Sequence, residues 1–376
     1  MKKYFIPFLL ILIVVCINIL AAQINSTYHI QKEISIPIGS GKGKVNIEYM
    51  TLGRSVGYPD AMTIDNDGNY IFGSRLQQET VQKFDNDGHF ISIISMSGCN
   101  NENVNYPYRL AIDSLNAIYV LDVWKCVDPN HPDLITHGDA IKKFDADGKF
   151  IYRLGYESVR PNPTDHDRIE EMWTTPGGGV YFKDYFNSKN EKNLYGGTKI
   201  YNSIFGIDSD GTLVGKIDTC LYQNYNGDMI SIIQKQDSNS LNYSIIHFQT
   251  PIEKSTQRKV VTKQEGLKRI RNFSIANTKD ELEFLGFDKE NNMYLNKVAE
   301  FYRNGFAYVH SFKDGKIVYK YSPQDVLLSK IEFPDYQRKR FIDSKGNIYI
   351  VDIKFTTYKH FTEGDHIEIQ KWVEER

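Results

Sequence analysis

The sequence predicts an all-β fold built from six successive four-stranded antiparallel sheets. Two hairpin patterns alternate along the chain, the strand-like runs are short and rich in β-branched and aromatic residues, and helical periodicity is scarce. Each first pattern is followed by one second pattern, so one repeating unit holds four strands. A single four-stranded unit cannot bury both faces of its sheet, so consecutive units are expected to stack as the blades of a ring. Six units predict a six-bladed β-propeller.

The first pattern is a strand, a tight turn and a second strand. Its copies are AMTIDNDGNYIFGS from Ala61, RLAIDSLNAIYVLD from Arg109, EMWTTPGGGVYFKD from Glu171, FLGFDKENNMYLNK from Phe284, KRFIDSKGNIYIVD from Lys339 and the weaker YNGDMISIIQ from Tyr225. Asp-Gly and Gly-Asn pairs stand at the turns because residues there need positive φ, which Gly and Asn tolerate.

The second pattern is another hairpin. It is found as VQKFDNDGHFISII from Val81, IKKFDADGKFIYRL from Ile141 and IFGIDSDGTLVGKI from Ile204, with degenerate copies over Tyr243 to Val260 and Tyr319 to Phe333. The connections between the two hairpins of a unit, and between units, would then lie at the opposite end of each sheet from the tight turns.

The last unit stops before a fourth strand, since it runs from Arg340 to Asp352 and then from His366 to Val373. Two strand-like runs upstream of the first unit, Glu33 to Ile38 and Lys44 to Leu52, are unassigned. We expect one of them to supply the missing outer strand and close the ring, which removes an exposed sheet edge. The domain plan is an N-terminal segment at 23–52 followed by the propeller at 53–376.

The units YPDAMTIDNDGNYIF…VQKFDNDGHF and YPYRLAIDSLNAIYVLD…IKKFDADGKF resemble NHL-repeat propellers, and more loosely the exported bacterial six-bladed propellers. The resemblance implies the fold and says little about function. An amidating lyase with a histidine-bound metal and the gluconolactonase-like propellers are enzymes on similar scaffolds. The matching positions here hold no histidine, so neither catalytic set is carried over; they are Ala61, Arg109, Glu171, Phe284 and Lys339.

The first 22 residues have the zones of a secretory signal: Lys2 and Lys3, an apolar run from Tyr4 to Leu20, and Ala21 and Ala22 before the expected cleavage point. The chain is therefore predicted to be exported, to the periplasm or beyond the cell. One alternative is an uncleaved anchor, the only membrane contact we expect. Another is lipidation of Cys16, although Val15 stands where such a signal needs a small residue.

The charge of the chain argues against nucleic acid as a partner. Removal of residues 1–22 deletes two lysines and no acid, so the formal net charge moves from -2 to -4. A basic face that neutralises phosphates is the expected mark of a nucleic-acid binder. The basic stretch from Arg258 to Arg271 is interpreted as a solvated connection between the fourth and fifth units, with contact to an anionic surface as the alternative.

Every long segment is expected at the connection end of the sheets, where function usually concentrates. These segments are Trp124 to Asp139, Tyr156 to Arg168, Tyr185 to Thr198, Lys254 to Asn277, Ala299 to Phe306 and Lys354 to Asp365. They are rich in aromatic residues, represented by Trp124, Tyr185, Tyr302 and Phe355. The rings are candidates for a platform that binds a protein, peptide or carbohydrate, and the alternative is that they only pack the loops onto the sheets.

Charged residues of both signs come just before the predicted innermost strands, where they would surround the mouth of a central channel. They are Asp60, Arg109, Glu170, Glu171, Glu283, Lys339 and Arg340. Such a ring is a candidate site for a polar or zwitterionic ligand. The alternative is a set of salt bridges between neighbouring units.

No residue pattern identifies a metal, a cofactor or a catalytic group. The Asp-x-Asp-Gly tetrads lack the Glu that a calcium loop needs at position twelve and are interpreted as hairpin turns. His131, His137 and His166 lie in the long segments, but their spacing matches no compact zinc motif. We therefore expect a non-enzymatic binding protein of the cell envelope; the alternative is a hydrolase or lyase that acts on a small polar substrate at the channel.

Three cysteines follow the predicted signal, in a compartment that permits disulfides. Cys99 precedes the second unit and Cys126 follows its second strand, so both are placed at the same end and a disulfide between them is predicted. Cys220 is a rival partner.

Overall fold

The structure is a computed structural model. Its first strand begins at Tyr28, one residue after the start of the described part of the chain. It describes residues 27–375 except 48, 51–54, 57–60, 75–77, 99–101, 129–130, 156–167, 175–179, 193–197, 208–212, 218–221, 224–228, 238–239, 249–266, 276–280, 299–313, 325, 334–338 and 355–363. The predicted signal lies outside this range. Within the part described, no helix has the length and apolar character needed to cross a membrane.

The described strands form six four-stranded sheets and one two-stranded sheet. Sheet 1 has β4 (Ala61–Ile64), β5 (Tyr70–Gly73), β6 (Val81–Phe84) and β7 (Phe90–Ser95); sheet 2 has β8 (Pro107–Ile112), β9 (Ile118–Asp128), β10 (His131–Phe144) and β11 (Phe150–Gly155); sheet 3 has β12 (Arg168–Thr174), β13 (Val180–Lys192), β14 (Thr198–Ile207) and β15 (Leu213–Ile217).

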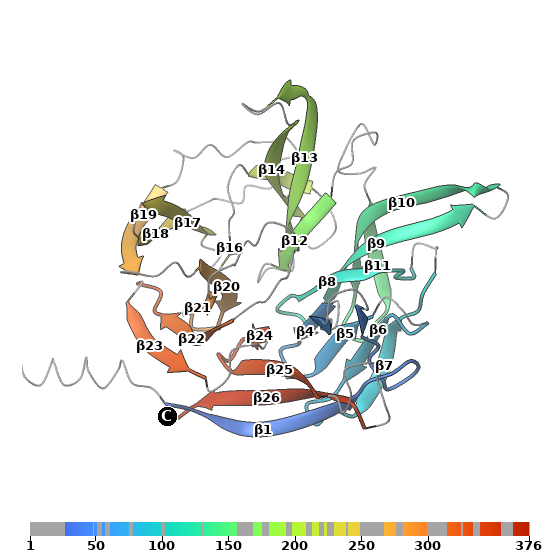
Figure 1. Cartoon of the computed structure of the whole chain (residues 1–376), viewed down its shortest axis with the longest axis horizontal. Helices are drawn as coiled ribbons and strands as arrows, with labels where there is room; N and C mark the ends of the chain where they lie inside the picture. Colours follow the sequence, from blue (N-terminus) through green and yellow to red (C-terminus); the bar gives the residue numbers. More distant parts are fainter. Residues whose placement is uncertain are drawn as a thin grey trace, which may run out of the picture. The chain divides into compact units, whose positions relative to one another are not determined.

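Sheet 4 has β16 (Tyr222–Gln223), β17 (Met229–Asp237), β18 (Ser240–Phe248) and β19 (Leu267–Ile275); sheet 5 has β20 (Glu281–Phe287), β21 (Met293–Val298), β22 (Asp314–Tyr321) and β23 (Leu327–Glu332); sheet 6 has β24 (Lys339–Ile342), β25 (Ile348–Lys354), β26 (His366–Glu374) and β1 (Tyr28–Pro37). In sheets 1 to 5 consecutive strands are neighbours, as Figure 1 shows. The chain is thus all-β, with the four-stranded antiparallel sheets of a β-propeller. Side chains are described throughout much of sheets 1, 2, 5 and 6, and in sheets 3 and 4 almost only the backbone.

The chain divides into two compact units. One consists of Met1–Glu33, Asn277–Asp352 and Ile369–Arg376, and the other of Ile34–Ala276 and Ile353–Glu368.

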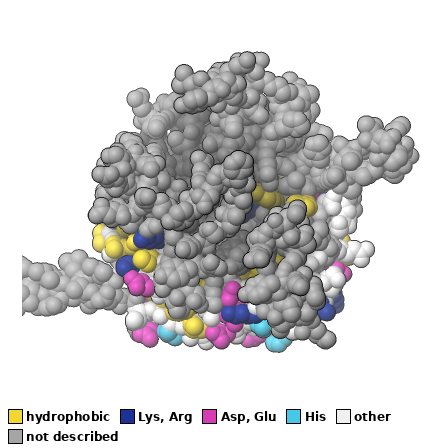
Figure 2. Space-filling model, in the orientation of Figure 1, with side chains coloured by type: hydrophobic (Ala, Val, Ile, Leu, Met, Phe, Trp, Pro, Cys, Tyr) yellow, Lys and Arg dark blue, Asp and Glu magenta, His cyan; other side chains and the backbone are white. Residues whose placement is uncertain are grey.

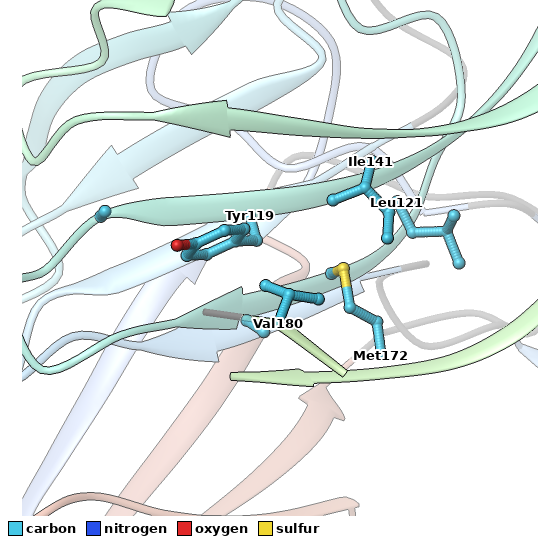
Figure 3. Packing of buried hydrophobic residues seen from close by; sticks show 7 residues of the cluster. Tyr119, Leu121, Ile141, Met172 and Val180 are labelled. Atoms are coloured by element: carbon cyan, nitrogen blue, oxygen red, sulfur yellow. The ribbon is translucent and has the colours of Figure 1, made fainter. Parts of the chain in front are cut away.

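The buried apolar residues lie between consecutive sheets. In one cluster Tyr119, Leu121 and Ile141 of sheet 2 meet Met172 and Val180 of sheet 3, as Figure 3 shows. A second cluster joins sheets 1 and 2 through Ile71, Val81, Ile94, Val104, Ile118, Val120 and Phe144, and a third joins sheets 5 and 6 through Tyr294, Val318, Ile331, Phe333, Ile348, Ile350 and Trp372. A sheet in this fold is therefore stabilised mainly by the faces of its neighbours.

The missing outer strand of the last sheet does come from the N-terminal segment. β1 pairs with β26, and the run Glu33 to Ile38 lies mostly within it. The backbone N–H of Glu375 donates to the carbonyl of Thr27 at 2.9 Å, and that of Ile38 to Asp365 at 3.2 Å, so the two strands are antiparallel. The other candidate run, Lys44 to Leu52, contributes only an isolated bridge at Val45 and the two-stranded sheet of β2 (Tyr49–Met50) and β3 (Ser55–Val56).

Two of the predicted loops are strands instead. The segments Trp124 to Asp139 and Tyr185 to Thr198 were expected to be irregular, but they continue β9 into β10 and β13 into β14. The expectation ended each strand at its first polar residues. In the first of these segments, β-branched residues such as Val127, which pairs with Ile135, favour the continued pairing.

The prediction for the fourth unit was also wrong in one strand. Its outer strand was expected before Val260, with Arg258 to Arg271 as a solvated connection, whereas β19 (Leu267–Ile275) is the outer strand and pairs with β18. Basic residues are tolerated there because an edge strand exposes one side to water, and charges on it discourage further pairing.

Candidate functional site

The two ends of each sheet are built differently, and we name them by their connections. The turn end carries the tight hairpins between first and second and between third and fourth strands. The connection end carries the link between second and third strands and the links between sheets.

At the turn end an aspartate organises six of the described hairpins, and Ser322 takes the same place in the turn between β22 and β23. Asp65 accepts the backbone N–H groups of Asp67 at 2.9 Å and Asn69 at 2.8 Å, and Gly68 between them has φ of 90°. The same arrangement recurs at Asp85, Asp113, Asp145, Asp288 and Asp343. The interpretation of these tetrads as hairpin turns is confirmed where the structure describes them.

Several turn aspartates also hold a buried tyrosine six residues later. The hydroxyls of Tyr294 and Tyr349 lie 3.0 Å and 2.9 Å from the carboxylates of Asp288 and Asp343. Burial, with the nearby negative charge of Asp288, raises the pKa of Tyr294 well above its usual range, so the phenol remains a neutral donor. The turn end of these sheets is therefore a rigid hydrogen-bonded structure.

Neighbouring turns of sheets 1 and 2 are joined side by side. The Asn66 amide donates to the Asn116 side chain at 2.7 Å and to the carbonyl of Asp113 at 2.9 Å, and Asn116 donates in turn to Asp67 at 2.8 Å. These side chains are already engaged with one another. The turn end thus offers few free polar groups for a ligand in this part of the molecule.

One turn brings three potential metal ligands together. Atoms of Asp85, Asp87 and His89 lie within 4.8 Å of one another. The Asp85 carboxylate already accepts two backbone N–H groups, and Nδ1 of His89 lies 3.3 Å from it. The cluster is accounted for by the hairpin turn.

At the connection end, sheets 2 and 3 each extend into a two-stranded arm. Arm 2 consists of Val123–Asp128 paired with His131–Asp139, and neither β8 nor β11 pairs with it. Arm 3 consists of Phe186–Lys192 paired with Thr198–Tyr201, beyond the reach of β12 and β15. Figure 1 shows β9 and β10 running on together past the ends of β8 and β11.

A buried ion pair lies at the base of arm 2. The Nζ of Lys142 lies 2.7 Å from Oδ2 of Asp122, and the two residues are 2% and 0% exposed. Burial lowers the pKa of Lys142 and raises that of Asp122, while their mutual attraction opposes both shifts. A charge of this kind is retained inside a protein only when it is well paired.

The same ion pair fixes the link between sheets 1 and 2. Oδ1 of Asp122 accepts the backbone N–H groups of Asn105 at 3.0 Å and Tyr106 at 2.7 Å, and Lys142 donates to the carbonyl of Asn103. In sheet 1 the equivalent of Lys142 is Gln82, whose amide binds the backbone of Gly43 and Lys44. Sequence reasoning missed both residues. The available signal was the change from VQKF to IKKF between two otherwise matching hairpins.

The predicted channel-mouth residues fall within the innermost strands rather than ahead of them. Arg109 lies in β8, Glu170 and Glu171 in β12, Glu283 in β20, and Lys339 and Arg340 in β24; Asp60 lies outside the described residues. Pro107 pairs with Asp122, so the start of β8 lies at the base of arm 2. Arg168 pairs with Tyr185, so the start of β12 lies at the base of arm 3.

Arg340 has a structural environment. It is 5% exposed, donates from Nη1 to Oδ1 of Asn296 at 2.7 Å, and its guanidinium carbon lies 5.1 Å from the centre of the Phe333 ring. Asn296 and Phe333 belong to sheet 5 or directly follow it, so this arginine joins sheets 5 and 6. Its position fits the inter-sheet alternative.

The remaining predicted residues divide between the arms and the residues that are not described. Trp124 pairs with Gly138 in arm 2, and Tyr185 pairs with Asn202 at the base of arm 3. Cys126 pairs with Thr136, His137 with Lys125, and His131 with Asp128. Tyr302, Phe355, His166 and Cys99 lie outside the described residues, so the disulfide stays a prediction.

Charged side chains of both signs lie close together where the surface is described. In Figure 2, along the lower rim of the face in view, lysines and arginines are interspersed with aspartates and glutamates. This pattern agrees with the near-balanced composition of the chain, with 45 basic and 47 acidic residues.

The fold and these two unlike ends define a β-propeller with an elaborated connection end. No protein-family model matches the chain, and no curated protein is detectably similar to it. Among solved structures it is similar to a member of the DUF4221 family from Bacteroides vulgatus, with a TM-score of 0.49, 11% identity, and coverage of 94% of this chain and 100% of that one.

Two further solved structures are more distant. A putative gluconolactonase has a TM-score of 0.38 and 10% identity, with 92% of each chain covered. A mannose phosphorylase from Leishmania mexicana has a TM-score of 0.32 and 8% identity, with 68% of this chain and 79% of that one covered. At these values no activity is transferred.

Proposed function

We propose that this protein is a non-enzymatic binding protein that recognises its partner through the connection end, with arms 2 and 3 as the main contact elements. The observation that carries the proposal is that two adjacent sheets extend the same hairpin past their flanking strands. The turn ends of the same fold are short and internally bonded. Long elements on a rigid scaffold are where binding residues usually lie.

The physics of a two-stranded ribbon supports this role. A hairpin without a third strand or a covering layer is marginally stable in water. Arm 2 carries the apolar residues Trp124, Val127 and Ile135. A partner that covers the ribbon gains their burial, and tryptophan and tyrosine are the residues most often dominant at interfaces. The expected partner is a protein, peptide or carbohydrate.

We further propose that the six sheets are the blades of one NHL-like ring. The support is that contacts follow chain order, from sheet 1 to 2, 2 to 3 and 5 to 6. In addition, the turn at Gly88 of sheet 1 approaches Ile34 of β1, whose strand belongs to sheet 6. A ring would leave no sheet face uncovered.

The proposed place of action is the cell envelope. The support is the signal-like sequence of residues 1–22 and the cysteines that follow it. A retained apolar run would hold the propeller at a membrane, and cleavage would release it.

The test is to trim the arms. In arm 2 an Asn-Gly turn would join Val123 directly to Asp139, and in arm 3 it would join Tyr185 to Asn202, because these residues already pair and two-residue turns close such hairpins. Each variant is cross-linked in envelope extract and its captured partners are identified by mass spectrometry. The control replaces the exposed turn-end residues Lys289 and Lys345 by glutamine.

Wild type and control are expected to capture the same partner, and the trimmed proteins to lose it while keeping their unfolding midpoint. Equal capture by the trimmed proteins would place the binding surface elsewhere. No reproducible capture by wild type would contradict the proposal.

A further inference from the structure

The link between β1 and sheet 1 begins with a short glycine-rich loop. Residues 39–44 read Gly-Ser-Gly-Lys-Gly-Lys, and we name them the lysine loop. Backbone pairing closes the loop at its base, where the N–H of Gly39 donates to the carbonyl of Val45 at 3.1 Å and that of Val45 to Pro37 at 3.0 Å. The loop is therefore a defined turn that stands on two paired backbone segments.

The buried side chain of Gln82 in β6 fixes the conformation of the lysine loop. Its Oε1 accepts the backbone N–H of Gly43 at 2.8 Å, and its Nε2 donates to the carbonyl of Lys44 at 2.7 Å. Gln82 is 1% exposed, so the interior of sheet 1 holds the loop in place. A ligand would meet a preformed backbone, which reduces the entropy lost on binding.

The backbone of the loop has the conformation of an anion-binding nest. The angle φ is positive at its three glycines, 147°, 99° and 78° in chain order, and Ser40 and Lys42 between them have negative φ. Alternation of this kind turns consecutive backbone N–H groups toward one side, and the concavity that they form binds anions. The groups brought together in this way are the N–H groups of Ser40, Gly41 and Lys42.

These three N–H groups are available to a ligand. Among the hydrogen bonds of the described residues, none is donated by the backbone N–H of Ser40, Gly41 or Lys42. Ser40 and Lys42 are exposed, and a methyl group added to Gly41 would meet nothing within 4 Å. The loop thus presents three consecutive donors beside open space.

Two ammonium groups accompany these donors. Lys42 and Lys44 are exposed, and neither forms an ion pair with a carboxylate among the described side chains. The Nζ of Lys42 lies 4.9 Å from the centre of the Phe90 ring, and Cδ of Lys44 lies against Gly39. Both side chains therefore stay beside the loop, and their charges are not neutralised there.

We propose that the lysine loop binds a phosphate monoester, with the N–H groups of residues 40–42 and the ammonium groups of Lys42 and Lys44 as donors. The two positive charges match the charge of about −2 that a phosphate monoester carries above its second pKa of about 6. The next described element is the strand β2, so the loop lacks the helix N-terminus of a nucleotide-binding P-loop. The proposal goes beyond the proposed function, because arms 2 and 3 take no part in it.

The test is isothermal titration calorimetry on the full chain in an uncharged detergent, at a pH above 7. The probes are methyl phosphate, a dianionic monoester, and dimethyl phosphate, a monoanionic diester of similar size. Wild type is expected to bind methyl phosphate about tenfold more tightly than dimethyl phosphate. Lys42→Gln and Lys44→Gln should each weaken binding of methyl phosphate about tenfold, since each removes one charge-assisted hydrogen bond.

A further variant tests the backbone donors. Gly41→Ala strains a residue whose φ is 99° and displaces the N–H groups on either side of it, so it should also weaken binding of methyl phosphate. Its control is Gly364→Ala, because Gly364 has a similar φ of 103° and equally open surroundings outside the loop. The control for charge is Lys149→Gln with Lys345→Gln, two exposed lysines at the turn end.

Both controls should bind methyl phosphate like wild type. The proposal is overturned if wild type does not bind methyl phosphate or does not distinguish it from dimethyl phosphate. It is also overturned if the charge control weakens binding as much as the loop variants do, because the attraction would then come from the net charge of the chain.

Soluble esters and phosphatidate headgroups carry the same phosphate monoester, and a second pair of probes separates them. Glycerol 3-phosphate is compared with dihexanoyl phosphatidate, which adds two short acyl chains to it. Tighter binding of the phosphatidate that is lost in Lys42→Gln assigns a lipid headgroup, and equal binding of the two assigns a soluble ester.

Failure of this inference can be told apart from failure of the proposed function. The arm-trimmed proteins keep the lysine loop, so they should still bind methyl phosphate while losing the macromolecular partner. Partner capture without binding of methyl phosphate would leave the proposed function standing and end the phosphate site.

Discussion

Backbone groups at the two ends of sheet 2 form hydrogen bonds of different range. At the turn end the partners are close in sequence, and at the connection end they are distant. At the turn end, Asp113 accepts N–H groups only two and four residues ahead. At the connection end, Asp122 and Lys142 bind a link that lies 16 to 39 residues away. The local arrangement recurs in the described turns of sheets 1, 2, 5 and 6, whereas the long-range ion pair is described in sheet 2 and has Gln82 at the equivalent position of sheet 1.

The largest loss of unfolding free energy is expected from a variant that disrupts the connection end. Lys142→Met would leave the Asp122 carboxylate buried without its cation, at a cost of about 3–5 kcal/mol in unfolding free energy, measured by urea denaturation. The double variant with Asp122→Asn should recover part of the loss, because no charge then remains buried. Equal losses in the single and double variants would show that the pair does not act as a unit.

A second comparison separates packing from backbone conformation in two glycines with positive φ. A methyl group at Gly88 would lie 2.6 Å from Cγ2 of Ile34, whereas at Gly41 it meets nothing within 4 Å. We expect Gly88→Ala to cost about 3 kcal/mol in unfolding free energy and Gly41→Ala about 1 kcal/mol. If the two costs are alike in thermal denaturation, the turn of sheet 1 does not pack on β1 as described.

A third variant tests the buried part of the turn end. Tyr349→Phe removes the hydroxyl that lies 2.9 Å from the Asp343 carboxylate and should cost about 1.5 kcal/mol. Sheet 1 carries Ile71 at the equivalent position, so the tyrosine is not required by the turn itself. An unchanged urea midpoint would mean that the hydroxyl finds an equal partner in water.

The smallest effect concerns pH at an exposed turn. Burial acts to raise the pKa of Asp85, but hydrogen bonds from the backbone and side chain of His89 and from the backbone of Asp87 outweigh it and leave the pKa below its ordinary 3.8. A lowered folded-state pKa stabilises the protein above the unfolded-state value and loses that contribution as pH falls through the folded-state value. Between about pH 5 and 3, wild type should therefore lose more stability than Asp85→Asn. Parallel melting curves would contradict this assignment.

The sequence predicted the turn end well and the connection end poorly, for a physical reason. Asp, Gly and Asn at fixed offsets determine a hairpin turn within five residues, so the turns at Asp65 and Asp343 are legible in isolation. The length of arm 2 depends on cross-strand pairs such as Val127 with Ile135, which no local rule specifies.

The same limit applied to single residues of the candidate site. The sequence placed Arg109 and Arg340 in one class, as charges at the start of an innermost strand. The structure separates them, since Arg109 is exposed while Arg340 is buried against Asn296. Burial depends on the neighbouring sheet, and a repeat pattern does not encode which neighbour closes over which residue.

The pairing of β1 with β26 has a consequence for biogenesis. Thr27 and Glu375 form hydrogen bonds across 348 positions of sequence, so β1 leaves the ribosome long before its partner strand is synthesised. Contacts at such separation form late and slowly. Until then the apolar residues Ile34 and Ile36, which are buried in the folded protein, are exposed. The nascent chain therefore avoids aggregation only if the last sheet is synthesised promptly or a chaperone binds the exposed strand.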